Sequence, residues 1–273
     1  MQNILITGCS SGIGYQTALT LKNNGIKVYA SARKDEDVEM LKELGFDTFK
    51  LDVTMKEDIT KALNTILEND KKLDAVFNNA GYGQPGAVED VSTQTLKEQF
   101  ETNFFGLHEL TIQAMKIFRT QNYGKIIQHS SVLGIISLKF RGAYNASKYA
   151  IEGLNDTLRQ ETLNSNIFIS TINTGPVTSK FRENGLKKFN ENIDIKNSFF
   201  TDTYKKELKV RLETNEDKAP FNLPATSVAN VVLEIMNNPK PKPRYYVTKA
   251  TYILGFFKRI LSTKVLDRLL NKI

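Results

Sequence analysis

A tyrosine and a lysine four residues apart, Tyr144 and Lys148, form the pair in this chain best suited to proton chemistry. The residues that follow, 149–159, carry apolar side chains at helical spacing and hold almost no helix breakers. Because residues i and i+4 share one face of a helix, the phenol and the ammonium should point the same way. An adjacent ammonium favours the phenolate, so we expect it to lower the pKa of Tyr144 and make this residue an acid or base near neutral pH.

Solvated helices also carry such pairs by chance, and four motifs that precede this pair are what give it meaning. They are a glycine turn after a strand at Gly8 to Gly14, a turn from Asn78 to Gly81 after another strand, Asn103, and Ser131 at the end of an apolar run. This ordered set resembles the short-chain dehydrogenase/reductase family, whose pattern is TGxxxGxG, NNAG, Asn, Ser and YxxxK. The resemblance extends from Asn3 to about Phe181 and is closest to the 17β-hydroxysteroid/retinol-dehydrogenase-like branch, which includes bacterial NADP-dependent aldehyde reductases.

The resemblance implies a reaction and a role for each motif. Members of the family move a hydride between a nicotinamide coenzyme and a carbonyl or alcohol. Ser131 would hydrogen-bond the carbonyl oxygen, Tyr144 would donate a proton to it, and Lys148 would lower the phenol pKa and hold the nicotinamide ribose. Asn103 would hold a water at a helix irregularity and maintain a proton relay. The residues expected to contact the coenzyme are Gly8, Ser10, Ser11, Gly12, Ile13, Gly14, Arg33, Asp52, Val53, Asn79, Ala80, Gly81, Tyr144, Lys148, Gly175, Val177 and Ser179.

The glycine turn and the end of the second predicted strand indicate which coenzyme binds. Gly8, Gly12 and Gly14 permit a tight turn and let backbone N–H groups at a helix N-terminus approach a pyrophosphate. NAD-binding relatives have an acidic residue at the end of the second strand that holds the ribose 2′-hydroxyl, whereas this chain has Ala32 there and Arg33 next. Because no carboxylate would repel a 2′-phosphate and a guanidinium could bind one, the sequence predicts NADP.

Two departures from the family pattern follow the sixth predicted strand. The family has Pro-Gly here, and then a threonine that bonds the nicotinamide carboxamide. This chain has Thr174 in place of the proline and Ser179 in place of the threonine. The serine keeps the hydroxyl, so we expect carboxamide binding to survive, whereas the lost proline leaves the rigidity of the turn open.

Length, charge and cysteine content exclude several other classes of protein. A chain of 273 residues is typical of one domain with a substantial core. The net charge is +7, but residues 239–273 hold nine basic residues and one acid, so the rest of the chain sums to −1 and does not suggest nucleic-acid binding. The single cysteine, Cys9, excludes an intrachain disulfide, and no Cys/His cluster suggests a metal site. No signal peptide or bilayer-spanning apolar run is visible, so we expect a cytoplasmic enzyme.

Strands and helices alternate along the chain, as they do in βαβ units. We therefore expect an α/β fold with a doubly wound parallel sheet, the Rossmann fold, in a single domain. The predicted strands lie near 3–7, 26–31, 47–51, 73–77, 124–130, 167–172 and 244–248, and the predicted helices near 12–24, 35–44, 55–70, 93–119, 143–164 and 224–237. We assign 1–249 to the NADP-binding and catalytic domain, with a substrate-covering insertion at 180–222, and 250–273 to a C-terminal amphipathic basic helix.

The insertion at 180–222 is rich in aromatic residues, namely Phe181, Phe189, Phe199, Phe200 and Tyr204. The segment between Ser131 and Tyr144 adds Leu133, Ile135, Ile136, Leu138 and Phe140. Some of these side chains are ordinary core, but an apolar cleft with few charges suits a lipophilic carbonyl compound better than a sugar or an acid. We therefore expect an aldehyde reductase for lipophilic substrates. A steroid- or retinoid-type alcohol dehydrogenase is the alternative, and a non-catalytic NADP(H) sensor is a third reading.

The segment from about 251 to 272 has the pattern of one amphipathic helix of roughly six turns. Its apolar stripe consists of Ile253, Phe257, Ile260, Leu261, Val265, Leu269 and Leu270, with basic residues between them. The stripe could pack on this chain, on a neighbour in the homo-oligomer that the resemblance implies (a dimer or tetramer), or on a membrane surface. We expect docking on protein, over the aromatic insertion, because apolar surface left in water costs about 25 cal/mol per Å².

Overall fold

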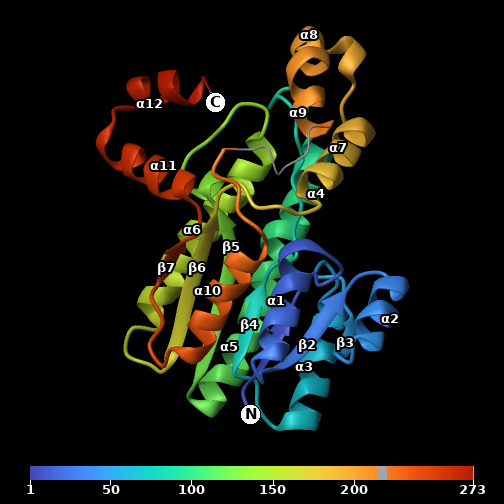
Figure 1. Cartoon of the computed structure of the whole chain (residues 1–273), viewed down its shortest axis with the longest axis vertical. Helices are drawn as coiled ribbons and strands as arrows, with labels where there is room; N and C mark the ends of the chain where they lie inside the picture. Colours follow the sequence, from blue (N-terminus) through green and yellow to red (C-terminus); the bar gives the residue numbers. More distant parts are fainter. Residues whose placement is uncertain (214–219, 273) are drawn as a thin grey trace.

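A seven-stranded, fully parallel sheet forms the centre of the computed structural model, which describes residues 1–213 and 220–272 (Figure 1). The strands are β1 (Asn3–Ile6), β2 (Lys27–Ala32), β3 (Asp47–Lys50), β4 (Ala75–Asn78), β5 (Gly124–Ser131), β6 (Ile167–Thr174) and β7 (Arg244–Tyr246). Their order is β3-β2-β1-β4-β5-β6-β7, so the winding reverses between β1 and β4. Sheets of this kind bind dinucleotides at the carboxyl ends of the strands where the order reverses. The predicted doubly wound Rossmann sheet is confirmed.

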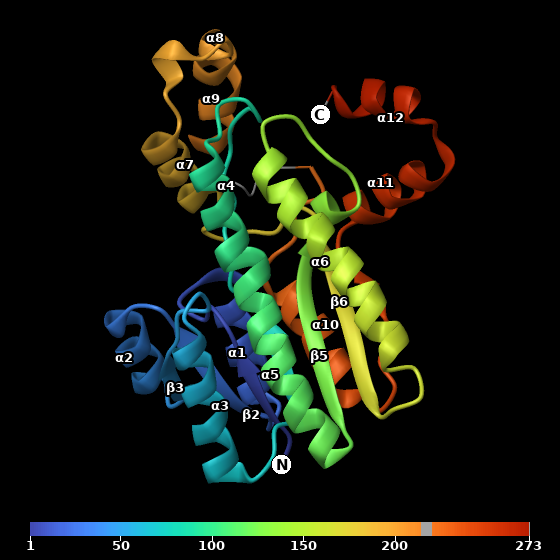
Figure 2. The same ribbon diagram turned by 180° about the vertical axis from the view of Figure 1, so that it is seen from behind.

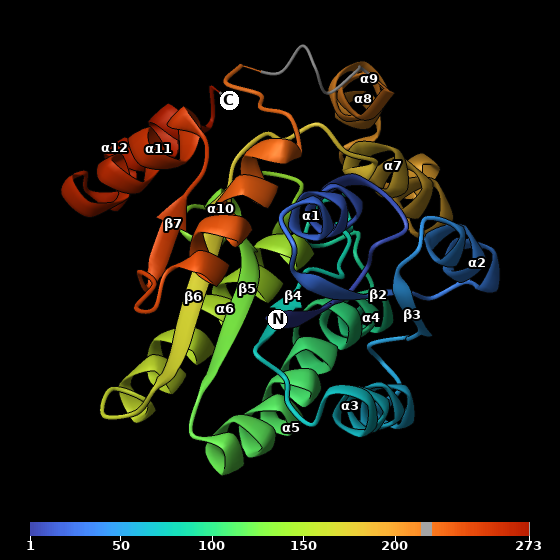
Figure 3. The ribbon, with the colours of Figure 1, turned by 60° about the horizontal axis from the view of Figure 1, so that its bottom comes forward.

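Helices cover both faces of the sheet, and the alternation of side chains along the strands supplies a core on each face. One face is covered by α1 (Gly12–Asn23), α2 (Asp35–Glu43) and α10 (Thr226–Asn237), and the other by α3 (Lys56–Asp70), α5 (Gly106–Gln121) and α6 (Gly142–Glu161), as Figures 2 and 3 show. In β1, Ile4 and Ile6 belong to the first core and Leu5 to the second. The apolar runs in the sequence are therefore strands with both faces buried.

The long helix predicted at 93–119 is interrupted in the structure. The helix α4 (Thr93–Phe100) passes into a π-helical turn, Glu101–Phe105, and then into α5. A Cβ on Gly106, the first residue of α5, would lie 2.4 Å from the backbone oxygen of Val53. The glycine therefore allows the close approach of these two segments, and the π-helical turn directs Asn103 into the interior.

The insertion after β6 folds into a helical lid, which the sequence does not predict. The lid consists of α7 (Phe181–Asn192), a 3-10 turn (Ile195–Asn197), α8 (Thr201–Thr203), a π-helical turn (Tyr204–Leu208) and α9 (Lys209–Glu213). Residues 214–219 of the predicted insertion lie outside the described residues. The lid stands at the carboxyl end of the sheet, on the side of β1 to β3 (Figure 1).

The C-terminal tail is formed by two helices and not by the single helix that the sequence predicts. The first, α11 (Lys249–Ile260), ends where Leu261 takes an extended backbone conformation. The second, α12 (Thr263–Leu270), begins after Ser262, which also has extended dihedral angles. The backbone oxygen of Ser262 accepts from the N–H groups of Val265 and Leu266, so a new helix begins here instead of the first one continuing. Ile273 lies outside the described residues.

The tail also docks on a different segment from the one predicted. Its buried residues Leu266 and Leu270 cluster with Val132, Leu133 and Ile136, which follow β5. The aromatic residues of the lid form a cluster of their own, and Figure 1 shows the lid and the tail on opposite sides of the upper end of the molecule. The expectation that the tail covers the aromatic insertion is therefore wrong, because Phe189 and Tyr204 are buried in a cluster with Ala87 and Phe140 and not under the tail.

Candidate active site

The carboxyl end of β5 and the start of α6 bring together the three residues predicted to carry the chemistry. Ser131 is the last residue of β5, and its hydroxyl lies close enough to the Tyr144 phenol to act on the pKa of that group. Lys148 lies one helical turn after Tyr144, with Nζ 5.6 Å from the centre of the tyrosine ring. The same Nζ donates a hydrogen bond of 2.7 Å to the backbone oxygen of His129 in β5. The strand thus fixes the position of both the serine and the lysine.

The protonation of this pair differs from the sequence prediction. Burial raises the pKa of Tyr144 to about 12, although the Ser131 hydroxyl and the Arg141 guanidinium act in the opposite direction. Burial also lowers the pKa of Lys148 to about 8, and the Glu152 carboxylate raises it. The prediction that the ammonium lowers the phenol pKa toward neutrality is wrong for this structure, because desolvation of the buried phenolate is the larger effect. Tyr144 is consequently a protonated acid at neutral pH.

Asn103 lies at the helix irregularity expected from the resemblance. It is 1% exposed within the π-helical turn and clamps the backbone of Tyr82, accepting from its N–H at 3.1 Å and donating to its carbonyl at 2.9 Å. Its amide also donates to the Ser147 hydroxyl at 3.2 Å, and Ser147 is the residue before Lys148. The amide therefore connects the π-helical turn to the catalytic helix.

The glycine turn after β1 and the asparagine turn after β4 meet where the strand order reverses. Gly8 and Gly12 have positive φ angles of 72° and 57°, which side-chain-bearing residues rarely adopt. A Cβ on Gly14 would lie 2.1 Å from the backbone oxygen of Gly8. Asn79 donates to the backbone oxygens of Thr7 and Gly8 at 2.9 and 3.1 Å. These contacts shape a narrow backbone turn that a pyrophosphate can approach closely.

The neighbouring predicted coenzyme residues complete this turn. Ser11 precedes α1 without a side-chain hydrogen bond to the helix, so the first N–H groups of α1, from Gly12 onward, are not capped by it. Ser10, Ile13 and Ala80 are half-buried beside the turn, while Gly81 packs against Asn103. These predicted coenzyme residues therefore lie together at the turn between β1 and α1.

The end of β2 keeps the features that favour a phosphate. Ala32 is 2% exposed, whereas the Arg33 side chain is exposed and has no carboxylate partner among the described residues. Asp52 follows β3, and one of its oxygens accepts from the N–H and hydroxyl of Thr54 at 3.0 and 2.8 Å. That carboxylate is thus partly used to hold the turn before α3, and Val53 is buried against α5.

The segment after β6 lies directly against the glycine turn. A Cβ on Gly12 would be 3.2 Å from Cβ of Ser179, so the predicted carboxamide-binding serine faces the start of α1. Its hydroxyl accepts a hydrogen bond from the N–H of Phe181 at 3.2 Å. Val177 forms a β-bridge with Leu223, and a Cβ on Gly175 would collide with the Thr248 hydroxyl at 2.1 Å. These contacts tie the segment to both the lid and the base of the tail.

His129 is a residue of the site that the sequence analysis does not identify. Its Nδ1 lies 3.1 Å from Oδ1 of Asn79, and its Nε2 lies 3.2 Å from the Thr174 hydroxyl. Burial, with a smaller effect of Lys148, lowers its pKa to about 3, so the imidazole is neutral. The threonine that replaces the family's proline is therefore held by this histidine, which answers the question of rigidity. Two signals in the sequence could have been combined to predict this contact. One is a histidine inside an apolar strand, and the other is a residue with a hydroxyl where the family has a proline.

The lid places one aromatic side chain on Tyr144, the predicted proton donor. The rings of Phe181 and Tyr144 meet edge to face, with their centres 5.2 Å apart. Phe189 and Tyr204, by contrast, are 0% exposed inside the lid, and Phe199 is 87% exposed to solvent. As expected for part of this set, Phe189, Phe200 and Tyr204 are core residues, because they pack in one apolar cluster.

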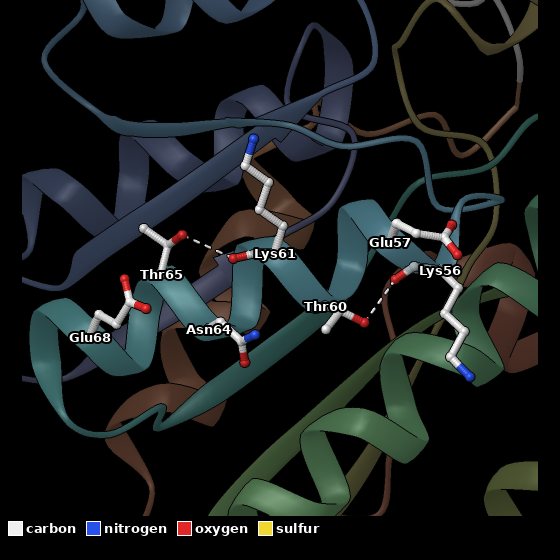
Figure 4. Close-up of a pocket in the computed structure, with 7 residues that line it drawn as sticks. All are labelled: Lys56, Glu57, Thr60, Lys61, Asn64, Thr65 and Glu68. Carbon is white, nitrogen blue, oxygen red and sulfur yellow. Dashed lines mark hydrogen bonds between the residues drawn. The ribbon is translucent and has the colours of Figure 1, made fainter.

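The outer face of α3 carries a shallow depression, which Figure 4 shows. All of its lining residues belong to this one helix, and its two threonines bond to backbone oxygens four residues earlier, as Thr60 does to Lys56 at 3.0 Å. It contains none of the predicted catalytic residues, and we interpret it as an ordinary solvated helix face. In the described ranges no three His, Cys, Asp or Glu side chains are placed to hold a metal ion, and no helix is long and apolar enough to cross a membrane.

Comparison with known proteins agrees with this geometry. The family model described as short chain dehydrogenase matches residues 2–189, more than half of the chain. The chain therefore belongs to the short-chain dehydrogenase/reductase family and is an oxidoreductase. The residues that match the family pattern are those assembled at the carboxyl edge of the sheet.

Curated relatives cover nearly the whole chain. The "Uncharacterized oxidoreductase YbbO" of Escherichia coli K12 is 36% identical over 271 residues, which is 99% of this chain and 94% of that protein. The "NADPH-dependent 3-dehydrocapnine reductase" of Ornithobacterium rhinotracheale is 28% identical and spans 100% of this chain and 97% of its own. The "3-ketodihydrosphingosine reductase" of Bacteroides thetaiotaomicron is 32% identical over 77% of this chain and 75% of its own.

Solved structures share the fold at lower sequence identity. A short-chain dehydrogenase/reductase from Burkholderia phymatum in complex with NAD has a TM-score of 0.78 at 22% identity, over 95% of this chain and 92% of its own. ElxO with NADP bound has a TM-score of 0.74 at 22% identity, over 90% of this chain and 96% of its own. Both coenzymes occur among the structural neighbours, so the likeness establishes the fold and not the choice of coenzyme.

Proposed function

We propose that this protein is an NADP(H)-dependent oxidoreductase that interconverts a carbonyl group and an alcohol, as an aldehyde reductase for lipophilic substrates. The observation that supports this proposal most is the convergence of Ser131, Tyr144 and Lys148 at the carboxyl end of β5. These residues lie beside a glycine turn whose close backbone contacts fit a dinucleotide.

Bound at this turn, NADPH would supply a hydride for the reduction of the carbonyl carbon. The Ser131 hydroxyl holds the carbonyl oxygen, and Tyr144 donates its proton to that oxygen as the alcohol forms. The raised pKa of Tyr144, about 12, keeps the phenol protonated at neutral pH, which suits the reductive direction. Lys148 is positioned to stabilise the phenolate that remains, because its Nζ lies 5.6 Å from the centre of the Tyr144 ring.

Proton return to the phenolate is assigned to Lys148 and the residues around it. With a pKa of about 8, Lys148 can release a proton near physiological pH more readily than an exposed lysine. Asn103 lies in the π-helical turn and donates a hydrogen bond of 3.2 Å to the hydroxyl of Ser147, the residue before Lys148. This route is the proton relay that the resemblance implies for Asn103.

Arg33 supports NADP as the coenzyme. Its guanidinium is exposed at the end of β2 and has no competing carboxylate among the described residues, and the neighbouring position is the buried Ala32. A 2′-phosphate could take a charge-assisted, bidentate hydrogen bond from this side chain. The "NADPH-dependent" relative from Ornithobacterium rhinotracheale is consistent with this assignment.

A lipophilic substrate is supported by Phe181 over Tyr144 and by the apolar segment that follows β5. Curated relatives also include a reductase of a ketone of a sphingoid base and retinol dehydrogenase 8. A steroid- or retinoid-type alcohol dehydrogenase is the second candidate, and the latter relative favours it. The family resemblance further favours a homo-oligomer, a dimer or a tetramer.

The coenzyme and substrate proposals can be tested with one set of proteins. Fluorescence titration should show tighter binding of NADPH than of NADH, and Arg33→Ala should reduce the difference by about 1.5–3 kcal/mol through loss of a charge-assisted bond. Arg119→Ala, at an exposed position on α5, is the matched control and should leave the difference unchanged. Equal affinities in the wild type would contradict the coenzyme assignment.

The same proteins are then screened for NADPH oxidation over straight-chain aldehydes, ketones, retinal and a steroid ketone. Preferential turnover of long aldehydes supports the main proposal. Preference for retinal or the steroid supports the second candidate instead. Coenzyme binding without turnover of any carbonyl compound would support a sensor and contradict both enzymatic proposals.

A further inference from the structure

The helix α11 has two apolar faces, and only one of them is covered. Thr251 and Gly255 are buried, and Leu254 and Phe257 pack on the cluster that contains Val132. The opposite face carries four large apolar side chains that remain 59%, 43%, 58% and 58% exposed: Tyr252, Ile253, Phe256 and Ile260. Their spacing of i, i+1, i+4 and i+8 places them in one stripe along the helix. We call this stripe the outer face of the tail.

The two helices of the tail that carries the outer face are basic. Both helices of the tail carry exposed lysines or arginines, and one acid, Asp267, opposes them, which gives a net charge of +5 over 249–272. None of these basic side chains forms a salt bridge within the part of the chain that the structure describes; they are Lys249, Lys258, Arg259, Lys264, Arg268 and Lys272. Val265 of α12 adds a further apolar side chain that is 46% exposed.

We propose that the outer face of the tail is a peripheral binding surface for an anionic lipid bilayer. A stripe of aromatic and aliphatic residues bordered by lysine and arginine is the pattern of helices that lie in the membrane interface. Tyrosine and phenylalanine bury apolar rings at the level of the headgroups, while the basic residues attract anionic lipids. A bilayer therefore satisfies both the apolar stripe and the uncompensated charge.

Charge also distinguishes a bilayer from a second copy of the chain. A symmetric dimer through this face would bring two segments of net charge +5 together, with like charges facing each other. Each copy has one acidic residue in this segment, Asp267, which is too few to neutralise the basic residues. An anionic surface reverses the sign of this electrostatic contribution and makes it attractive.

The location of the surface relates it to the active site. Figures 1 and 2 show the tail at the end of the molecule where the carboxyl ends of the strands point. The inner side of the tail packs on residues 132–138, and Tyr144 belongs to the same apolar cluster. When the protein binds a bilayer through the outer face of the tail, the predicted catalytic residues at the edge of the sheet would lie close to the membrane. The inference goes beyond the proposed reaction and stands without it.

Co-sedimentation of the full-length protein with vesicles tests the proposal. The protein should bind vesicles of phosphatidylcholine mixed with phosphatidylglycerol, bind pure phosphatidylcholine at least about tenfold more weakly, and be released by high salt. The double variant Phe256→Ser with Ile260→Ser and the double variant Lys258→Glu with Arg259→Glu should each lose at least about tenfold in partitioning. Because these side chains are exposed, both variants should keep the wild-type thermal unfolding temperature.

Matched controls lie elsewhere on the surface. Leu163→Ser changes a side chain that is 69% exposed after α6, and Lys61→Glu with Lys71→Glu reverses two exposed charges around α3. Both controls should bind vesicles as the wild type does. Wild-type binding by either tail variant, or equal binding to neutral and anionic vesicles, would overturn the proposal. So would a lipid-free dimer in analytical ultracentrifugation that Phe256→Ser with Ile260→Ser dissociates, because a second copy would then occupy the face.

Discussion

The lid and the tail both lie at the carboxyl end of the sheet, but they treat their aromatic side chains in opposite ways. In the lid, Phe189 and Tyr204 are 0% exposed, and the Tyr204 hydroxyl accepts from the N–H of Ala87 at 2.7 Å and bonds to Asp90. In the tail, Tyr252 and Phe256 are 59% and 58% exposed. The lid is a small helical unit with its own core, whereas the tail is packed on one side only.

The segment between β5 and α6 joins these two regions. Phe140 packs in the cluster of the lid, and Leu138 packs in the cluster of the tail. The catalytic tyrosine follows directly on this segment and touches both, through the ring of Phe181 and through the tail's apolar cluster. The lid is therefore suited to enclosing a substrate, and the tail to contact with a further surface. Both pack against the segment beside Ser131, Tyr144 and Lys148, which we call the catalytic floor.

The largest effect on turnover is expected for a substitution in the catalytic floor, against which both the lid and the tail pack. Lys148→Met should lower turnover at least about 100-fold, because the phenolate loses its neighbouring cation. The folded pKa of Lys148, about 8, lies below its ordinary value of 10.5, so wild-type stability should decrease as the pH falls from 10.5 toward 8. The variant has no lysine to titrate at this position. As the pH is lowered from 10 to 7, its unfolding temperature should therefore rise relative to that of the wild type.

Thermal unfolding and steady-state NADPH oxidation measure the two parts of this prediction. Lys97→Met, at an exposed position of α4, serves as the control and should alter neither. A constant difference in stability across this pH range would show that Lys148 is not the buried cation that the structure describes.

The next effect separates the lid from the tail. Phe189→Ala should cost about 3–5 kcal/mol, because it removes a fully buried ring from the core of the lid. Hydrogen exchange should show lost protection in α7 and α9 with unchanged protection in α11 and α12. Phe256→Ala, which removes an exposed ring from the tail, should change neither region. Loss of protection in both regions after Phe189→Ala would mean that the lid and the tail form one unit.

A smaller effect tests whether the lid contributes to substrate binding. Phe181→Ala should raise KM for apolar aldehydes between about 10- and 100-fold, because its ring lies against Tyr144 where the substrate would bind. Phe199→Ala removes the same kind of side chain from a position 87% exposed on the same lid, and it should leave KM unchanged. Equal effects of the two variants would assign the lid's influence to its overall stability.

The smallest effect is a pH-dependent change in stability that we expect from His129, in the strand next to the catalytic floor. Its folded pKa of about 3 lies below the ordinary value of 6.5, so its contribution to stability is present above pH 6.5 and is lost as the pH falls. Between pH 6.5 and 5.5 the wild type should lose about 1 kcal/mol more than His129→Asn, which cannot titrate there. Urea unfolding at the two pH values measures this difference, and parallel losses would mean that the histidine is protonated in the folded state.

The sheet and the catalytic floor could be predicted from the sequence because their constraints are local. The apolar runs of β1 and β5, the glycines at Gly8 and Gly12, and the spacing of Tyr144 and Lys148 each fix a short stretch of backbone. Such signals can be read one segment at a time. The topology then brings the ends of these segments together at one edge.

The remaining features depend on contacts between segments that are distant in the sequence. The imidazole of His129 bonds to Asn79 and Thr174, fifty and forty-five residues away, so its role is not visible in its own strand. The raised pKa of Tyr144 results from burial under neighbouring segments, which the helical spacing cannot indicate. The break at Ser262 follows from the burial of Leu266 against the segment after β5 as much as from local preference. Tertiary packing decided each of these cases.

The central claim is that Tyr144 donates the proton in an NADPH-dependent reduction, and Tyr144→Phe tests it most directly. The change removes one hydroxyl and keeps the ring that packs against Phe181. Coenzyme affinity by fluorescence titration and turnover of the best aldehyde are measured on the same preparation. Turnover at least about 100-fold below the wild type, with NADPH affinity unchanged, is the result predicted for a lost general acid. Wild-type turnover by Tyr144→Phe would contradict the account.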